Sequence, residues 1–152
     1  MPRKAKRLKP SDQLSLPIPL EKDEQIKLCT WLKRKNIFFF AIPNGGSRNY
    51  LEAVALKKSG LLAGVPDLCV PIPSCGHHSL YIELKRRTKY AKVSDEQKEV
   101  IGRLNELGHL AVVCYGFDEA KQVVEDYLGN VPCRTQLIKK EAYEQVCLPD
   151  FM

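Results

Sequence analysis

The sequence predicts an α/β protein whose small mixed sheet is flanked by helices. Segments with helical periodicity alternate with short apolar segments in the order helix, strand, helix, two strands, helix, strand, helix, which is typical of this class. With 152 residues, 44% of them hydrophobic, the chain has the size of one ordinary domain. The longest apolar runs, such as residues 37–42, have six residues, whereas a transmembrane helix needs about 20.

The first half of the chain is expected to form two helices and two buried strands. Each strand is followed by a proline, Pro43 or Pro71, and the second helix is followed by Gly60. One helical line of the first helix is largely apolar and consists of Gln25, Leu28, Cys29 and Leu32. The expected elements are a helix at about 20–35, a strand at 37–42, a helix at about 50–59 and a strand at 65–70.

The second half begins with a strand that alternates cleanly. Its two faces consist of Leu80, Ile82 and Leu84 on one side and Tyr81, Glu83 and Lys85 on the other. Ser94 and Gln97 match a capping box that begins a helix, and Gly108 ends that helix. The expected elements are a strand at 80–85, a helix from 94 to about 107, a strand at 110–115 and a helix at 118–128. A short helix at about 135–146 is left open.

Positive charge is concentrated at the N-terminus. Of the formal net charge of +6, residues 1–10 contribute +5 with no acid, so the remainder of the chain nets only +1. Such an arm indicates attraction to a polyanion such as nucleic acid or an acidic membrane, and a solubilising tail is the open alternative. We divide the chain into a basic arm at 1–19, a central domain at 20–128 and a C-terminal extension at 129–152.

The six cysteines show no C-x-x-C spacing, so neither a zinc ribbon nor a redox motif is indicated. Four of them lie in or beside apolar stretches, where cysteine behaves as a small hydrophobic residue. We therefore expect a reducing compartment, a cytoplasmic protein and no disulfides. Cys75, His77 and His78 crowd one loop but lack a fourth metal ligand, so a solvated loop is the better interpretation.

The informative polar residues lie on two consecutive strands. Asp67 follows Pro66 near the start of one strand, while Glu83 and Lys85 share a face of the next, roughly 7 Å apart. If the strands pair, two carboxylates and one ammonium meet on the polar side of the sheet. Mg²⁺ is usually held by one or two carboxylates with water and phosphate, and a nearby lysine can orient the water or stabilise phosphate oxygens. An exposed strand with a Glu–Lys pair is the alternative.

Two further polar residues are predicted to face the core. Gln97 lies one helical turn before Val100 and Ile101, and Glu21 extends the apolar line of the first helix. Buried polar groups need partners, which a metal site at the sheet would supply. The alternatives are a capping-box role for Gln97 and a favourable acid at the helix start for Glu21. Glu24 competes with Glu21 for the place beside the site.

Taken in order, these residues resemble the virus-type replication-repair nuclease domain (VRR-NUC) of the PD-(D/E)XK nuclease superfamily. The pattern has an early helix with E-x-x-x-Q, a strand ending in P-N-G, then G-x-P-D, E-x-K and S-x-x-Q. The counterparts in this sequence are Glu21 with Gln25, Pro43-Asn44-Gly45, Gly64-Val65-Pro66-Asp67, Glu83-Leu84-Lys85, and Ser94 with Gln97. The resemblance covers about residues 20–128, and five motifs in order are far more specific than any single one.

The resemblance implies a PD-(D/E)XK restriction-endonuclease-like core and a Mg²⁺- or Mn²⁺-dependent endonuclease. Its substrate would be structured DNA, such as a branched or four-way junction or a flap, in replication, recombination or repair. By position, Asp67 and Glu83 would be metal ligands, Lys85 the catalytic lysine, and Glu21 and Gln97 auxiliary site residues. A phage-encoded protein acting in a bacterial host is compatible with it. So is a homodimer, because paired cuts need two sites at a fixed separation.

DNA contacts are expected from a run of positive charge that begins at Lys85 and contains no acid. The resemblance adds the glycine-rich segment after Pro43. The predicted DNA-binding residues are Asn44, Arg48, Arg86, Arg87, Lys89 and Lys92. Two competing functions remain: a non-catalytic nucleic-acid-binding module on a nuclease fold, and a sequence-specific restriction-type nuclease. For the latter, 152 residues leave little room for recognition loops.

Overall fold

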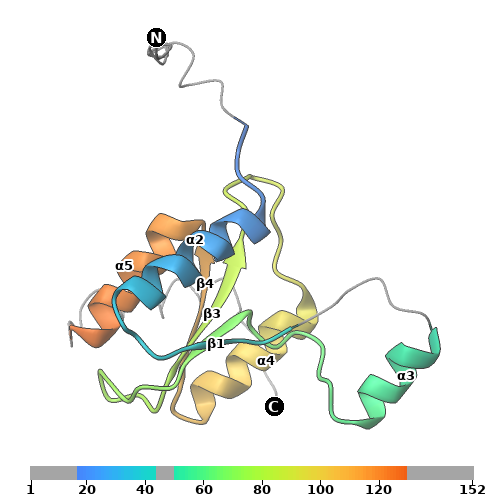
Figure 1. Ribbon diagram of the computed structural model, residues 1–152. Coiled ribbons are helices and arrows are strands. Elements are labelled where there is room, and N and C mark those ends of the chain that lie inside the picture. The colour runs from blue at the N-terminus through green and yellow to red at the C-terminus, as the bar shows by residue number, and fades with distance from the viewer. Residues whose placement is uncertain (1–16, 44–49, 130–152) are drawn as a thin grey trace.

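The computed structural model describes residues 17–43 and 50–129, in which helices and strands follow the predicted order (Figure 1). The elements are α2 (Glu21–Arg34), β1 (Phe40–Ala41), α3 (Tyr50–Lys58), β2 (Leu68–Val70), β3 (Leu80–Lys85), α4 (Asp95–Glu106), β4 (Leu110–Tyr115) and α5 (Phe117–Leu128). No helix among these residues has the length and apolar character needed to cross a bilayer.

A four-stranded mixed sheet in the order β1-β2-β3-β4 forms the central layer. The β1–β2 and β2–β3 pairs are antiparallel, and the β3–β4 pair is parallel. Because parallel neighbours need a crossover connection, α4 joins β3 to β4 and covers one face of the sheet. α2 and α5 pack together on the opposite face (Figure 1). The predicted α/β class is therefore confirmed as a three-layer arrangement, and α3 stands apart from the layers (Figure 1).

The larger core lies between the sheet and the α2–α5 pair. Leu80, Ile82 and Leu84 of β3 are buried there against Leu28 and Leu32 of α2. Full burial of such a side chain contributes about 1.5–3 kcal/mol each, so this face fixes α2 against the sheet. The predicted apolar face of β3 is thereby confirmed.

The other face of β3 lies beneath α4. Tyr81 packs there against a smaller cluster that includes Ile101 of α4. Glu83 and Lys85 follow on the same face and are only 3% and 9% exposed. The alternative interpretation, an exposed strand with a solvated Glu–Lys pair, is therefore wrong. The alternation gave the correct faces, but it could not reveal that both faces are covered.

Segment 37–42 departs from the predicted buried strand. Only Phe40 and Ala41 form β1, and both are exposed, as is Phe38, whose exposed fraction is 69%. Among the described residues β1 is the edge strand, and it pairs with β2 through Phe40 opposite Cys69 and Ala41 opposite Leu68. An apolar run predicts a strand, but it does not say whether that strand is central or at an edge.

Some predictions lie outside the described residues: the arm at 1–10, Asn44, Arg48 and the short helix at 135–146. In the described loop that holds the Cys/His cluster, Cys75 Sγ lies 3.2 Å from the Tyr127 carbonyl oxygen. The four described cysteines carry free thiols. Within residues 17–43 and 50–129, no group of three or more His, Cys, Asp or Glu side chains is arranged to hold a metal ion.

Candidate active site

Asp67 and Glu83 meet across the β2–β3 pair. Leu68 lies opposite Ile82 in the register, so Asp67, one residue before β2, lies opposite Glu83. Directly opposite residues of an antiparallel pair share a face of the sheet. The Leu84 backbone N–H donates to Asp67 Oδ2 at 2.8 Å, which ties the Asp67 carboxylate to β3. The predicted meeting of the two carboxylates is therefore present.

Glu83 is the centre of the polar contacts on this face. Its Oε1 accepts a hydrogen bond from Gln97 Nε2 at 2.5 Å and lies 3.0 Å from Lys85 Nζ. One carboxylate oxygen is thus shared by a side chain of α4 and the ammonium of the same strand. The face brings together Asp67, Glu83, Lys85 and Gln97, four of the five predicted catalytic-site residues.

Gln97 forms the capping box and also contacts Glu83. Its backbone N–H donates to Ser94 Oγ and its Oε1 accepts from the Ser94 backbone N–H, which completes the capping box. The same side chain uses its Nε2 for Glu83. The cap therefore fixes the amide in the orientation that presents its NH₂ group to the carboxylate.

Gly64 explains why the G-x-P-D motif needs its glycine. Its φ is +85°, and a Cβ there would lie 2.4 Å from the Glu96 backbone carbonyl and 2.7 Å from the Gln97 backbone nitrogen. A side chain would therefore push the loop before Asp67 away from the start of α4. This close approach keeps Asp67 and Gln97 near each other. Sequence patterns alone did not indicate that contact.

The surroundings of the Asp67 and Glu83 carboxylates disfavour their ionised forms. The pKa of Glu83 is raised to about 7, chiefly by burial and then by the charge of Asp67, although the contact with Lys85 opposes the shift. The pKa of Asp67 is also raised, again chiefly by burial, against the Leu84 N–H bond and the charge of Lys85. Two carboxylates that resist ionisation side by side form a site that a cation would stabilise.

The acid of α2 that lies beside this cluster is Glu21. It is exposed at the first position of α2, its Oε1 accepts from the Arg86 backbone N–H at 3.2 Å, and its charge raises the pKa of both Asp67 and Glu83. The expectation that Glu21 faces the core is wrong. Glu24 takes that position on the buried line of α2, where it is 1% exposed.

Glu24 is engaged elsewhere. Its Oε2 accepts from the Phe117 backbone N–H at 2.9 Å, and its Oε1 lies 3.0 Å from Arg87 Nη2. Burial alone would raise the pKa of Glu24, but these two partners hold it below its ordinary value. Both oxygens are therefore used to join parts of the fold.

The donor set suits a hard divalent cation. Asp67 and Glu83 offer carboxylate oxygens on one face, and two carboxylates with water and substrate phosphate are the usual Mg²⁺ environment. The raised pKa values of both groups are the observation that supports this fit, because a bound cation would relieve their mutual repulsion. No thiol or imidazole among the described residues is needed for such a site.

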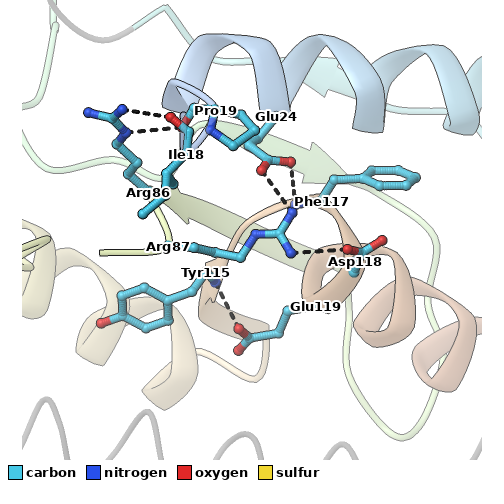
Figure 2. A network of polar contacts seen from close by, with 9 residues as sticks. All are labelled: Ile18, Pro19, Glu24, Arg86, Arg87, Tyr115, Phe117, Asp118 and Glu119. Atoms are coloured by element: carbon cyan, nitrogen blue, oxygen red, sulfur yellow. Dashed lines mark hydrogen bonds and ion pairs between the residues drawn. The ribbon is translucent and has the colours of Figure 1, made fainter. Parts of the chain in front are cut away.

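The predicted DNA-binding residues separate into two groups. Arg86 is half-buried and Arg87 is exposed, and both bind carbonyl or carboxylate oxygens of the protein (Figure 2). Lys89 and Lys92 are exposed. Beyond the predicted set, a cavity of about 280 Å³ is lined by Lys92, Val93, Lys98 and Tyr115. Tyr115 lies beside Lys85 in the β3–β4 register, and that pairing could not be read from the sequence.

Known proteins share both the sequence pattern and the fold. The VRR-NUC domain profile matches residues 11–118, more than half of the chain. A solved structure described as a VRR_NUC domain protein is similar with a TM-score of 0.64 and 26% sequence identity, over 75% of this chain and 92% of that chain. A search among curated proteins finds no match. The chain therefore belongs to the VRR-NUC domain family and is a nuclease-fold module of the PD-(D/E)XK type.

Proposed function

We propose that this chain is a divalent-metal-dependent endonuclease that cleaves DNA. The observation that carries the proposal is the cluster on the α4 face, where Asp67 lies opposite Glu83 and Lys85 Nζ is 3.0 Å from Glu83 Oε1. Burial of this cluster beneath α4 and the raised pKa of Glu83 set it apart from a surface ion pair. A non-catalytic binding module would have no use for such a costly arrangement.

Each residue has a distinct task in this proposal. Asp67 and Glu83 hold Mg²⁺ or Mn²⁺, and Glu21 adds a third negative charge from the start of α2. When bound, the cation supplies positive charge to the scissile phosphodiester and lowers the pKa of a bound water. Lys85 presents its ammonium to the same place and orients that water or stabilises the phosphate oxygens. Gln97 keeps the Glu83 carboxylate oriented.

The DNA backbone is proposed to pass along the positive surface next to the cluster. Lys89 and Lys92 are exposed after β3, and the cavity between Lys92, Lys98 and Tyr115 lies where β4 neighbours Lys85. Lysine side chains hold phosphates without reading sequence. The basic arm at 1–10, Asn44 and Arg48 remain predicted contributors to the same interaction.

We further propose a branched substrate and a homodimer. The cluster described above would cut one strand, and symmetric cuts in a junction need two copies related by a two-fold axis. α3 stands apart from the layers, and Leu51, Leu61 and Leu62 are exposed on it or just after it (Figure 1). Apolar side chains on a projecting helix would be covered by the second copy in such a dimer.

The test is cleavage of labelled duplex, flap and four-way-junction DNA in Mg²⁺, Mn²⁺ or EDTA. We expect metal-dependent cleavage by the wild-type protein, strongest on branched DNA, and none by Asp67→Asn, which removes a charge but little volume. Binding of all these DNAs without cleavage in any metal would instead support a non-catalytic binding module. Light scattering at micromolar concentration tests the dimer, because a mass near the 17.3 kDa of one chain would contradict it.

A further inference from the structure

The start of α2 is held from outside the helix. Its N-cap residue, Leu20, makes no side-chain cap hydrogen bond, so the helix lacks the usual local anchor. Arg86, directly after β3, holds the two residues before Leu20 with its guanidinium. Nε donates to the Pro19 carbonyl at 3.1 Å, and Nη2 donates to the Ile18 carbonyl at 2.6 Å (Figure 2). The Arg86 backbone N–H reaches Glu21 Oε1 at 3.2 Å.

The next residue fixes the same helix one turn further on. Arg87 Nη2 lies 3.0 Å from Glu24 Oε1, and its Nη1 lies 3.1 Å from Asp118 Oδ2 (Figure 2). Glu24 also accepts from the Phe117 backbone N–H, so α2, the end of β3 and the start of α5 are joined at one point. At Gly116 a Cβ would lie 2.4 Å from Arg87 Nε, so the absence of a side chain makes room for this guanidinium.

In these contacts the two arginines donate their hydrogen bonds to oxygens of the protein, which a DNA phosphate would have to displace. Each guanidinium donates to two separate oxygens of the chain. A guanidinium that already donates hydrogen bonds to oxygens of the protein gains little by giving them up to bind a phosphate. Arg87 is exposed, like Lys89 and Lys92, so the contacts with protein oxygens are what set the two arginines apart.

We propose that Arg86 is a positioning residue for the metal site, which it serves by holding the start of α2, and with it Glu21, against the end of β3. This rests on the proposed function, since it assigns Glu21 a place beside the cation. Arg86 directly follows Lys85, so one peptide unit links the catalytic lysine to the acid on α2. Arg87 and Glu24 form the anchor that keeps the rest of α2 in register.

Removal of the Arg86 guanidinium should loosen the first turn of α2. The Ile18 and Pro19 carbonyls would lose their donors, and a helix start without a cap frays. The Asp23 and Glu24 backbone N–H groups, which donate to the Leu20 carbonyl at 3.0 and 3.1 Å, report directly on that turn. Glu21 would then keep only its bond to the backbone N–H of residue 86 and would be held less firmly beside Asp67 and Glu83.

The test compares Arg86→Ala with Arg103→Ala, which removes an exposed arginine of α4. Calorimetric titration with Mn²⁺ should show about a 10-fold loss of affinity in Arg86→Ala, as for other residues that support metal ligands, and less than a twofold change in Arg103→Ala. In a Glu21→Gln background, Arg86→Ala should cause no further loss. Arg86→Lys keeps the positive charge but not the two-pronged guanidinium, so its Mn²⁺ affinity should lie between those of wild type and Arg86→Ala.

Two further readouts separate this role from DNA binding and from the proposed function itself. Hydrogen exchange at the Asp23 and Glu24 amides should accelerate in Arg86→Ala with or without metal, whereas binding of uncleaved DNA in EDTA should keep its salt dependence. An unchanged Mn²⁺ affinity together with a salt slope reduced by about 0.9 would make Arg86 a phosphate contact and overturn the inference. Absence of Mn²⁺ binding by the wild type would overturn the proposed function, and the exchange rates would still decide whether Arg86 holds α2.

Discussion

Two buried glutamates on opposite faces of one sheet have opposite electrostatics. Glu24, on the α2–α5 face, is 1% exposed, and its two oxygens are bound by a backbone N–H and a guanidinium that keep its pKa low. Glu83, on the α4 face, is 3% exposed, lies opposite Asp67 and has a pKa of about 7. Burial raises the pKa of both groups, but the partners of Glu24 outweigh it, whereas at Glu83 burial and the charge of Asp67 prevail over the contact with Lys85.

The contrast separates a carboxylate that holds the fold from one that we propose binds a cation. Glu24 has all the donors it needs and would gain nothing from a cation. Glu83 shares one face with a second carboxylate and has a lysine and an amide on a single oxygen. A destabilised, charge-crowded group in a folded protein indicates a functional site, whereas a satisfied one indicates structure.

The largest effect on stability should come from removing the guanidinium that pairs with Glu24. Arg87→Ala leaves the buried Glu24 without its guanidinium. Removal of one partner of a fully buried pair costs about 3–5 kcal/mol, and we expect the lower end of that range here because the Arg87 side chain is 44% exposed. Urea unfolding at pH 7.5 would measure it, with Arg103→Ala as the matched arginine control, expected within about 0.5 kcal/mol of wild type. A loss below about 1 kcal/mol in Arg87→Ala would contradict the anchor role.

A second, pH-dependent effect should come from Glu83. Its pKa rises from 4.5 in the unfolded chain to about 7 in the folded one, so the folded state binds the proton more tightly. The stability that this group contributes is complete below pH 4.5 and is lost as the pH rises through 7, by roughly 3 kcal/mol at about 1.4 kcal/mol per unit.

The comparison that measures it is unfolding in EDTA between pH 4.5 and 8, for wild type and Glu83→Gln. The wild type should lose stability across this range, and Glu83→Gln, which has no proton to release, should lose much less. Glu24 does not interfere, because its lowered pKa places its titration below this window. Parallel curves for the two proteins would contradict the raised pKa of Glu83.

The smallest effect should come from adding the cation. Mn²⁺ at ten times its dissociation constant should stabilise the wild type by about 1.4 kcal/mol, because it binds only the folded state. Asp67→Asn should gain almost nothing at the same concentration, whereas Arg103→Ala should gain as much as wild type. Thermal unfolding with and without Mn²⁺ measures the difference, and equal gains in Asp67→Asn and wild type would remove Asp67 from the site.

Sequence reasoning predicted those parts of the site that depend on local patterns. The capping box of Ser94 and Gln97, the alternation along 80–85 and the pairing of Asp67 with Glu83 all follow from spacing within or between neighbouring elements. Each is present in the structure.

The parts that failed depend on contacts between distant segments. Glu21 and Glu24 both extend an apolar line of α2, and the choice between them is made by Arg87, 63 residues further along the chain. The protein oxygens that Arg86 and Arg87 bind are equally invisible in a run of positive charge. The exposure of Phe38 follows from the position of the neighbouring β1 at the edge of the sheet. A local sequence pattern does not reveal the order of strands in a sheet.

The central claim is that the Asp67, Glu83 and Lys85 cluster is the catalytic centre of a metal-dependent DNA nuclease. Lys85→Ala tests it most directly, because it leaves both carboxylates in place and removes only the ammonium that lies 3.0 Å from Glu83. Single-turnover cleavage of branched DNA in Mn²⁺ should fall at least about 100-fold, while DNA binding in EDTA changes little. Cleavage by Lys85→Ala at close to the wild-type rate would contradict the account.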